Sequence, residues 1–214
     1  MKKELIISGV ILILGGLLLF FSTSGFSAFT MEAQRLQNLK AQPPEFPNIE
    51  VVDNKGREYN FDAFEGRHML MTFIYTSCAT ACPEMSSNMK YVYDMIDMEK
   101  YGDDLVFLSM SFDTERDTVE VLDRYAGYFD ADGESWRMLR VPDDDDLEEI
   151  LNMYEVTVIP EGDADFQHNT SFYLIEPDGR LGEVLDYREV DEAAETIIEA
   201  VESDDSDEEE VAAQ

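Results

Sequence analysis

The two cysteines, Cys78 and Cys82, are the only ones in the 214 residues, and three residues separate them. Thiolates are soft ligands that suit Cu(I), and two neighbouring thiols can also close into a disulfide. Three chemistries are therefore open: copper binding, thiol–disulfide exchange and an inert structural bridge. An inert structural bridge is disfavoured, because closing so short a loop would add little stability. Thiol–disulfide exchange stays open, although thioredoxin-type redox motifs have two residues between their cysteines rather than three. Zinc is disfavoured, because a closed zinc site needs four ligands.

A third copper ligand would have to come from one of the two histidines, His68 and His168. His168 follows an acidic segment and precedes a predicted strand, so it could reach the cysteines from another part of a sheet. A loop histidine is more often only solvated, and the residues alone leave its role open. His68 begins the strand that leads to the cysteines. Seven strand residues at about 3.3 Å each place it too far away, and we interpret it as structural.

The residues around the cysteines predict a strand that ends where a helix begins. An apolar, β-prone run covers residues 69–75, and a helical pattern starts near Pro83. Such a junction exposes backbone N–H groups and the positive end of a helix dipole, which favours thiolates. Met85 and Met89 lie on this helix, and thioethers can bind Cu(I). Their spacing is nevertheless that of a core-facing stripe, so we expect them to pack in the core.

The rest of the chain predicts an α/β fold with parallel crossovers near its middle. An N-terminal β-hairpin and a cysteine pair at the first central strand-to-helix turn make this layout similar to the thioredoxin fold, a central mixed sheet flanked by helices. Residues 161–167 are expected to form an acidic loop. Strands are expected at residues 49–53, 58–61, 68–75, 105–110, 136–141, 170–175 and 181–185, and helices at 83–100, 119–129, 143–154 and 191–201.

The charge balance is strongly acidic, with 48 Asp and Glu against 15 Lys and Arg and a net charge of −33. Such a surface repels nucleic acid, which we exclude as a partner. The acids could form a specific interface, but their spread along the chain favours a halophilic-type surface adapted to high salt. We therefore expect loss of compact structure at low ionic strength. The four acids at residues 143–146 are interpreted as a solvated helix start, with a divalent-cation site as the alternative.

The N-terminus predicts a membrane anchor. Lys2 and Lys3 precede an uncharged apolar run over residues 5–21, long enough to span a bilayer. The positive-inside rule places the N-terminus in the cytoplasm and the domain outside the cell membrane; a cleaved signal peptide is the alternative. The expected organisation is an anchor at 1–30, a linker at 31–44, a thioredoxin-like domain at 45–202 and a disordered acidic tail at 203–214.

Three segments resemble motifs of the Sco/SenC family, membrane-anchored copper proteins of cytochrome c oxidase assembly. Residues 73–83, FIYTSCATACP, are similar to F-x-Y-T-x-C-P-x-x-C-P. Residues 109–118, SMSFDTERDT, resemble S-V-D-P-E-R-D-T-P, and residues 168–179 resemble D-H-S-x-x-x-Y-L-x-D-P-x-G from its histidine onward. Ala79 and Thr114 stand where the family has prolines, which leaves metal affinity and thiol reactivity open.

The resemblance implies a thioredoxin-like domain that holds copper, as Cu(I) or also as Cu(II), between Cys78, Cys82 and His168. It implies a metallochaperone that delivers copper to the binuclear site of cytochrome c oxidase subunit II. The alternative is an enzyme, a thiol–disulfide oxidoreductase that reduces the cysteines of that site through Cys78 and Cys82. A peroxiredoxin-like peroxidase is a third and weaker interpretation. His168 distinguishes the first two, because copper binding should need it and thiol exchange should not.

Overall fold

The computed structural model describes residues 2–22, 31–79, 81–161 and 165–212, and it divides the chain into units at 1–42 and 43–214. The first unit holds helices α1 (Lys2–Ser22) and α2 (Met31–Ala41). Within the part of the chain that the structure describes, no helix combines the length and the apolar character that crossing a membrane requires. Helix α2 lies in the expected linker and ends before Pro43, because a proline disfavours the helical conformation of the residue before it.

The second unit is built on a seven-stranded mixed sheet with the order β2-β1-β5-β4-β3-β8-β9. Strands β3, β4 and β5 are parallel, whereas β1 pairs with β5, and β8 with β3, in the antiparallel sense. The predicted mixed sheet and N-terminal hairpin are confirmed. The strands are β1 (Glu50–Asp53), β2 (Glu58–Asn60), β3 (His68–Ile74), β4 (Leu105–Ser111), β5 (Trp136–Arg140), β8 (Phe172–Ile175) and β9 (Leu181–Leu185).

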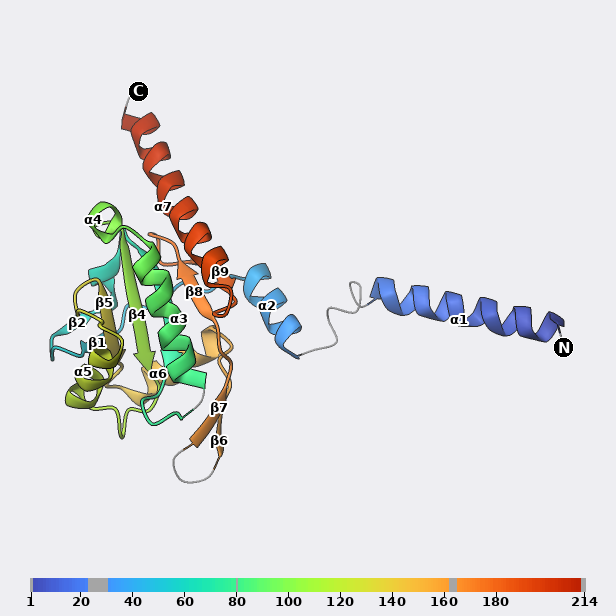
Figure 1. The fold of residues 1–214 in the computed structure, drawn as a ribbon, viewed down its shortest axis with the longest axis horizontal. Coiled ribbons are helices and arrows are strands. Elements are labelled where there is room, and N and C mark those ends of the chain that lie inside the picture. The colour runs from blue at the N-terminus through green and yellow to red at the C-terminus, as the bar shows by residue number, and fades with distance from the viewer. Residues whose placement is uncertain (1, 23–30, 80, 162–164, 213–214) are drawn as a thin grey trace. The chain divides into compact units, whose positions relative to one another are not determined.

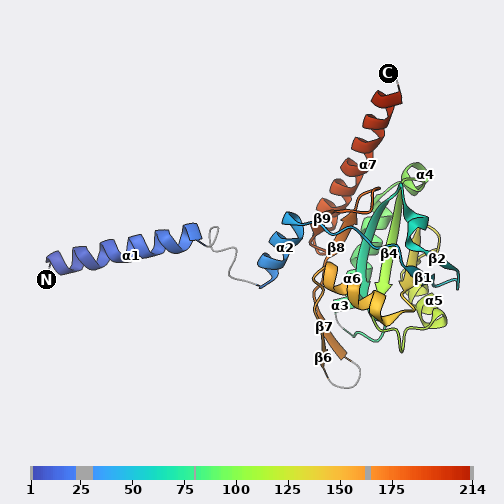
Figure 2. The ribbon, with the colours of Figure 1, turned by 180° about the vertical axis from the view of Figure 1, so that it is seen from behind.

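Helices cover both faces of this sheet, as the two opposite views show (Figures 1 and 2). On one face α3 lies beside α7, and it is joined to α5 by the buried Ser86 and Tyr125 hydroxyls, which are 2.9 Å apart. On the other face Tyr154, the C-cap of α6, packs against Phe73 of β3. The helices are α3 (Ala81–Met95), α4 (Met98–Tyr101), α5 (Val119–Tyr128), α6 (Asp144–Met153) and α7 (Val190–Ala212), with a 3-10 turn, η2, at Phe61–Phe64.

Strand β3 is buried along its whole length and forms the centre of the core. Its residues alternate between the two helical layers, as the twofold period of a strand requires. Thr72 points to α3, where its hydroxyl lies 3.1 Å from the sulfur of Met85, and Phe73 points to Tyr154. Met85 and Met89 are both fully buried. The prediction that they pack in the core is confirmed.

Three elements differ from their predictions. The helix expected over 83–100 breaks after α3, because the Asp97 side chain accepts the N–H of Glu99 and caps a separate turn, α4. The segment expected as an acidic loop forms a hairpin of β6 (Val158–Glu161) and β7 (Asp165–His168). The helix expected to end at Val201 continues to Ala212, where we expected a disordered tail; Glu and Ala in this stretch favour helix despite the repulsion between its acids.

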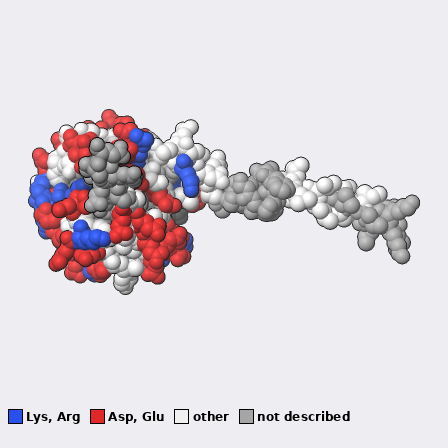
Figure 3. Space-filling model, turned by 90° about the horizontal axis from the view of Figure 1, so that it is seen from above, with Lys and Arg blue, Asp and Glu red and all other residues white. Residues whose placement is uncertain are grey.

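Acidic side chains dominate the visible surface of the second unit (Figure 3). The basic residues are few and often paired with acids, for example Arg57 with Glu134 at 2.8 Å and Lys100 with Glu202 at 2.8 Å. Exposed pairs of this kind stabilise a fold only weakly, because water and salt screen them. The large excess of carboxylates is therefore not offset by pairing, and salt dependence of the fold stays a prediction.

Candidate metal centre

The cysteines lie at the junction that the sequence predicts. Strand β3 ends at Ile74, Cys78 follows in the connecting loop, and Cys82 is the second residue of α3. The backbone N–H of Cys82 donates a hydrogen bond to Sγ of Cys78 over 3.3 Å. Both side chains are buried, with 7% of Cys78 and 0% of Cys82 exposed, and both are thiols rather than one disulfide. The chain thus places two soft sulfur ligands within one turn and away from water.

Burial also determines the protonation state of Cys82. It raises the pKa of the Cys82 thiol well above its ordinary value, and the nearby Cys78 adds to the rise. At neutral pH this group is therefore a protonated thiol, which is a poor nucleophile. A soft metal ion can displace the proton, because a metal binds the thiolate and releases the proton on binding. The donor set and its dry surroundings fit Cu(I), which accepts two or three soft ligands.

A buried carboxylate, Asp117, holds the loop before the cysteines. It accepts hydrogen bonds from the backbone N–H of Thr76 over 3.0 Å, from the Thr76 hydroxyl, and from the Ser111 hydroxyl over 2.5 Å. Asp117 is 0% exposed. It therefore joins the end of β4 to the loop that leads from β3 to Cys78. The sequence analysis assigned Asp117 no role of its own. A charged residue shortly after a buried strand could have indicated a buried hydrogen-bond acceptor.

Tyr75 connects the β6–β7 hairpin to the same end of the sheet. Its hydroxyl donates to the carbonyl oxygen of Phe166 over 3.1 Å and accepts from the N–H of Phe166 over 3.2 Å. The two rings also meet edge to face, 5.1 Å apart, and both contact Phe112. Because Phe166 lies in β7, this contact brings the strand that carries His168 to the cysteine end of β3. The sequence did not predict this contact, because Phe166 was expected to lie in an acidic loop.

The two histidines lie at different ends of the second unit. His168 ends β7, where its backbone pairs with Val158; its side chain lies outside the described part of the structure, and its ligation stays a prediction. Next to it, the Asn169 side chain accepts the N–H of Thr157 over 2.9 Å and closes the base of the hairpin. His68 begins β3, at the end opposite the cysteines. Its expected separation from the cysteines is confirmed.

Comparisons with known proteins agree with this geometry. Residues 39–203 match the SCO1/SenC family. The chain is similar to the SCO1 protein homolog of Bacillus subtilis, with 29% identity over 156 residues, 72% of this chain and 76% of the relative. It is 33% identical to the mitochondrial SCO1 homolog of Homo sapiens over 127 residues, 57% of this chain and only 40% of the human protein.

Solved structures share the fold. Arabidopsis thaliana ScoI with copper bound has a TM-score of 0.65 and 20% identity, covering 75% of this chain and 99% of that one. Yeast Sco1 with copper bound has a TM-score of 0.63 and 24% identity, covering 75% and 90%. At these identities the likeness establishes the thioredoxin-like fold alone. Since the family match spans most of the chain, the protein belongs to the SCO1/SenC family.

Proposed function

We propose that this chain is a copper-binding assembly factor that passes copper to subunit II of cytochrome c oxidase. The observation that carries the proposal is the pair of buried thiols, Cys78 and Cys82, within one turn at the β3–α3 junction. Relatives point the same way: one from Stutzerimonas stutzeri is named a putative copper-binding protein, and a structural relative is described as a member of the Sco family of cytochrome c oxidase assembly proteins.

In the proposed site, Cys78 and Cys82 supply the sulfur ligands for the copper cargo and His168 supplies a nitrogen. Tyr75 supports the third ligand, because it ties β7 to the end of β3. Release to the recipient occurs by ligand exchange, in which incoming thiolates replace those of Cys78 and Cys82. Oxidation of the two thiols to a disulfide, with loss of two protons and two electrons, removes both sulfur ligands and blocks loading.

The test is Cu(I) binding by the reduced full chain in detergent and molar salt, in competition with a Cu(I) chelator. We expect one copper per chain, and none after oxidation of the cysteines. His168→Ala should weaken binding at least about tenfold, or about 1.4 kcal/mol, and Tyr75→Phe should weaken it less. Gln167→Ala, on the same strand, is the control and should bind as the unaltered chain does.

The same variants distinguish copper binding from the rival function, thiol–disulfide exchange. The exchange rate of the copper-free chain with a small disulfide should be unchanged in His168→Ala, since exchange needs only the two thiols. The full burial of Cys82 keeps a disulfide substrate from reaching its sulfur, which favours copper binding over exchange. Absence of copper binding together with rapid exchange would favour the oxidoreductase, and unaltered copper affinity in His168→Ala would remove the histidine from the site.

We further propose that residues 1–30 anchor the protein in the cell membrane with the domain on the extracytoplasmic side. Lys2 and Lys3 before the apolar run at 5–21 support this orientation. The full chain should stay with membranes through an alkaline carbonate wash, and a chain that begins at residue 31 should be released. Release of both, or a mature protein whose mass lacks the first 25–30 residues, would contradict an uncleaved anchor.

A further inference from the structure

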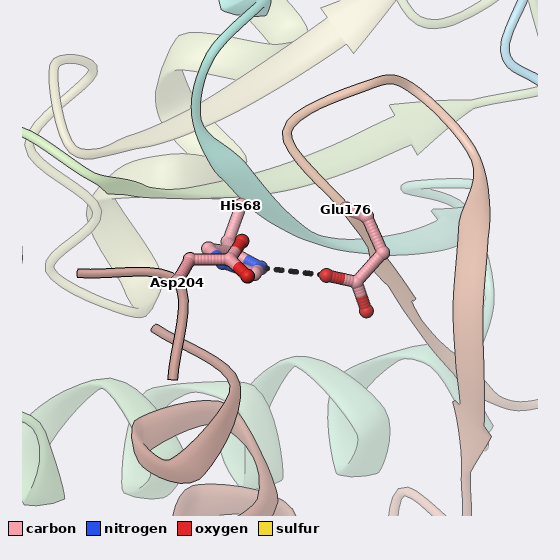
Figure 4. A group of neighbouring side chains, drawn as sticks. All are labelled: His68, Glu176 and Asp204. Atoms are coloured by element: carbon pink, nitrogen blue, oxygen red, sulfur yellow. Dashed lines mark ion pairs between the residues drawn. The ribbon is translucent and has the colours of Figure 1, made fainter. Parts of the chain in front are cut away.

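A second group of metal-ligating side chains lies at the opposite end of β3 from the cysteines. His68 begins β3, Glu176 follows β8, and Asp204 lies in α7, with their side chains turned toward one another (Figure 4). Nδ1 of His68 is 3.4 Å from Oε2 of Glu176, and Nε2 is 3.0 Å from Oδ2 of Asp204. One ligand atom from each of the three residues lies within 4.8 Å of the other two.

The imidazole of His68 is buried without hydrogen-bonded partners in the described part of the chain. Only 1% of the residue is exposed, and neither ring nitrogen makes a hydrogen bond to any described residue. The carboxylate oxygens are close enough, but they approach outside hydrogen-bond geometry. A buried polar group is normally satisfied, so a nitrogen in this state calls for a partner such as an ion. This observation is independent of the proximity of the two carboxylates.

The three side chains are close enough to supply ligands to one small divalent ion. Two ligands of a tetrahedral zinc ion, each about 2.1 Å from the metal, lie about 3.4 Å apart. The 3.4 and 3.0 Å contacts run to different ring nitrogens of His68, so a single ion would use one nitrogen and the other carboxylate would have to turn toward it. The side chains of Glu176 and Asp204 are 36% and 49% exposed, so either carboxylate can rotate toward a shared nitrogen and the ion can enter from solvent. One imidazole with two carboxylates suits zinc-class ions better than Cu(I).

The surroundings of Glu176 preserve the space for its carboxylate. A Cβ atom on Gly182, in the neighbouring strand β9, would lie 2.8 Å from Cδ of Glu176 and would force the side chain away. Two carboxylates and a buried imidazole at this separation would be stabilised together by a bound cation.

We propose that His68, Glu176 and Asp204 bind a divalent cation of the zinc class. The ion would join three segments that are distant in sequence, and it would fasten the C-terminal part of α7 to the start of β3. The site is separate from the copper centre, and its ligands are nitrogen and oxygen rather than sulfur. It therefore adds a structural metal site to the function proposed above and does not depend on that function.

The experiment is a Zn²⁺ titration of the full chain carrying Cys78→Ser and Cys82→Ser, in detergent and molar KCl. We expect one Zn²⁺ per chain and a rise in the unfolding midpoint when it binds. Asp204→Asn and Glu176→Gln should each weaken binding at least tenfold; both positions are partly exposed, so the fold should tolerate them. Glu199→Gln removes the same charge from an exposed position of α7 and should change the affinity less than twofold.

The absence of saturable Zn²⁺ binding would overturn the proposal and leave only an ion pair among these residues. Equal losses of affinity in Asp204→Asn and Glu199→Gln would also overturn it, because they would show non-specific attraction to an acidic surface. Unchanged affinity in Asp204→Asn would overturn it as well. If the serine variant does not fold, Co²⁺ added to the unaltered chain replaces Zn²⁺. Cobalt bound at this site gives visible absorption without thiolate-to-metal charge transfer, and Asp204→Asn should remove that component alone.

Discussion

Replacing Cys82 by serine should lower the Cu(I) affinity of the chain at least about 1,000-fold, or about 4 kcal/mol. Serine is nearly isosteric with cysteine, but its hydroxyl is a hard donor that stays protonated at neutral pH, and Cu(I) prefers soft sulfur. Cys82 is fully buried, so water cannot readily replace the lost ligand. The affinity should be measured by competition with a Cu(I) chelator on the reduced chain in molar salt.

The matched control is Ser86→Ala, one helical turn along α3. Ser86 is also fully buried and contacts Tyr125 through its hydroxyl, so the variant disturbs the same helix without removing sulfur. It should keep the copper affinity within about threefold of the unaltered chain, or about 0.7 kcal/mol. Retention of tight one-to-one binding in Cys82→Ser, or equal losses in the two variants, would show that Cys82 is not a ligand.

Local patterns predicted the cysteine junction correctly because its determinants are close in sequence. The run at 69–75 is apolar except for Thr72, as a strand buried on both faces should be. The residues from Met85 onward repeat at helical spacing. The two cysteines stand between them, and the structure places them between β3 and α3. The helix α3 begins at Ala81, two residues before Pro83, which is tolerated in a first helical turn because its missing N–H would have no helical partner.

The β6–β7 hairpin was missed because it carries little hydrophobic pattern. Pro160 argues against a central strand, and the acids of residues 161–165 suggest a solvated loop. Both features are compatible with a two-stranded hairpin outside the main sheet, in which Pro160 pairs with Phe166, whose N–H and C=O bond the Tyr75 hydroxyl. Tyr75 and Phe166 tie the hairpin to the end of β3, a contact across 91 residues that no local pattern reveals.

The same limit applies to His68. The interpretation as a structural residue was correct about its distance from the cysteines, but Glu176 and Asp204 were not recognised as its neighbours. These residues follow His68 by more than 100 positions. The pairing of β8 with β3 brings Glu176 to His68, and the packing of α7 brings Asp204 there. The expectation of a disordered tail from residue 203 also removed Asp204 from consideration.

The second large effect is expected from Asp117→Ala, which should lower the free energy of unfolding by about 3–4 kcal/mol. The variant leaves the N–H and hydroxyl of Thr76 and the buried hydroxyl of Ser111 without their acceptor. Each hydrogen bond to a charged group contributes about 1.5–3 kcal/mol, and loss of the buried charge offsets part of the sum. Denaturant unfolding in molar salt, followed through the single, fully buried Trp136, measures the change.

Asp117→Ala should also weaken Cu(I) binding by about 10–100-fold, as loss of a group that positions ligands commonly does. The loop from Thr76 to Cys78 would lose its fixed attachment to β4, and the Cys78 sulfur would no longer be held beside Cys82. Asp94→Ala is the control, because Asp94 is an exposed acid paired with Lys90 and should cost no more than about 1 kcal/mol. A folded Asp117→Ala variant with unchanged stability and copper affinity would mean that the position of the loop is determined by packing around Tyr75 rather than by this carboxylate.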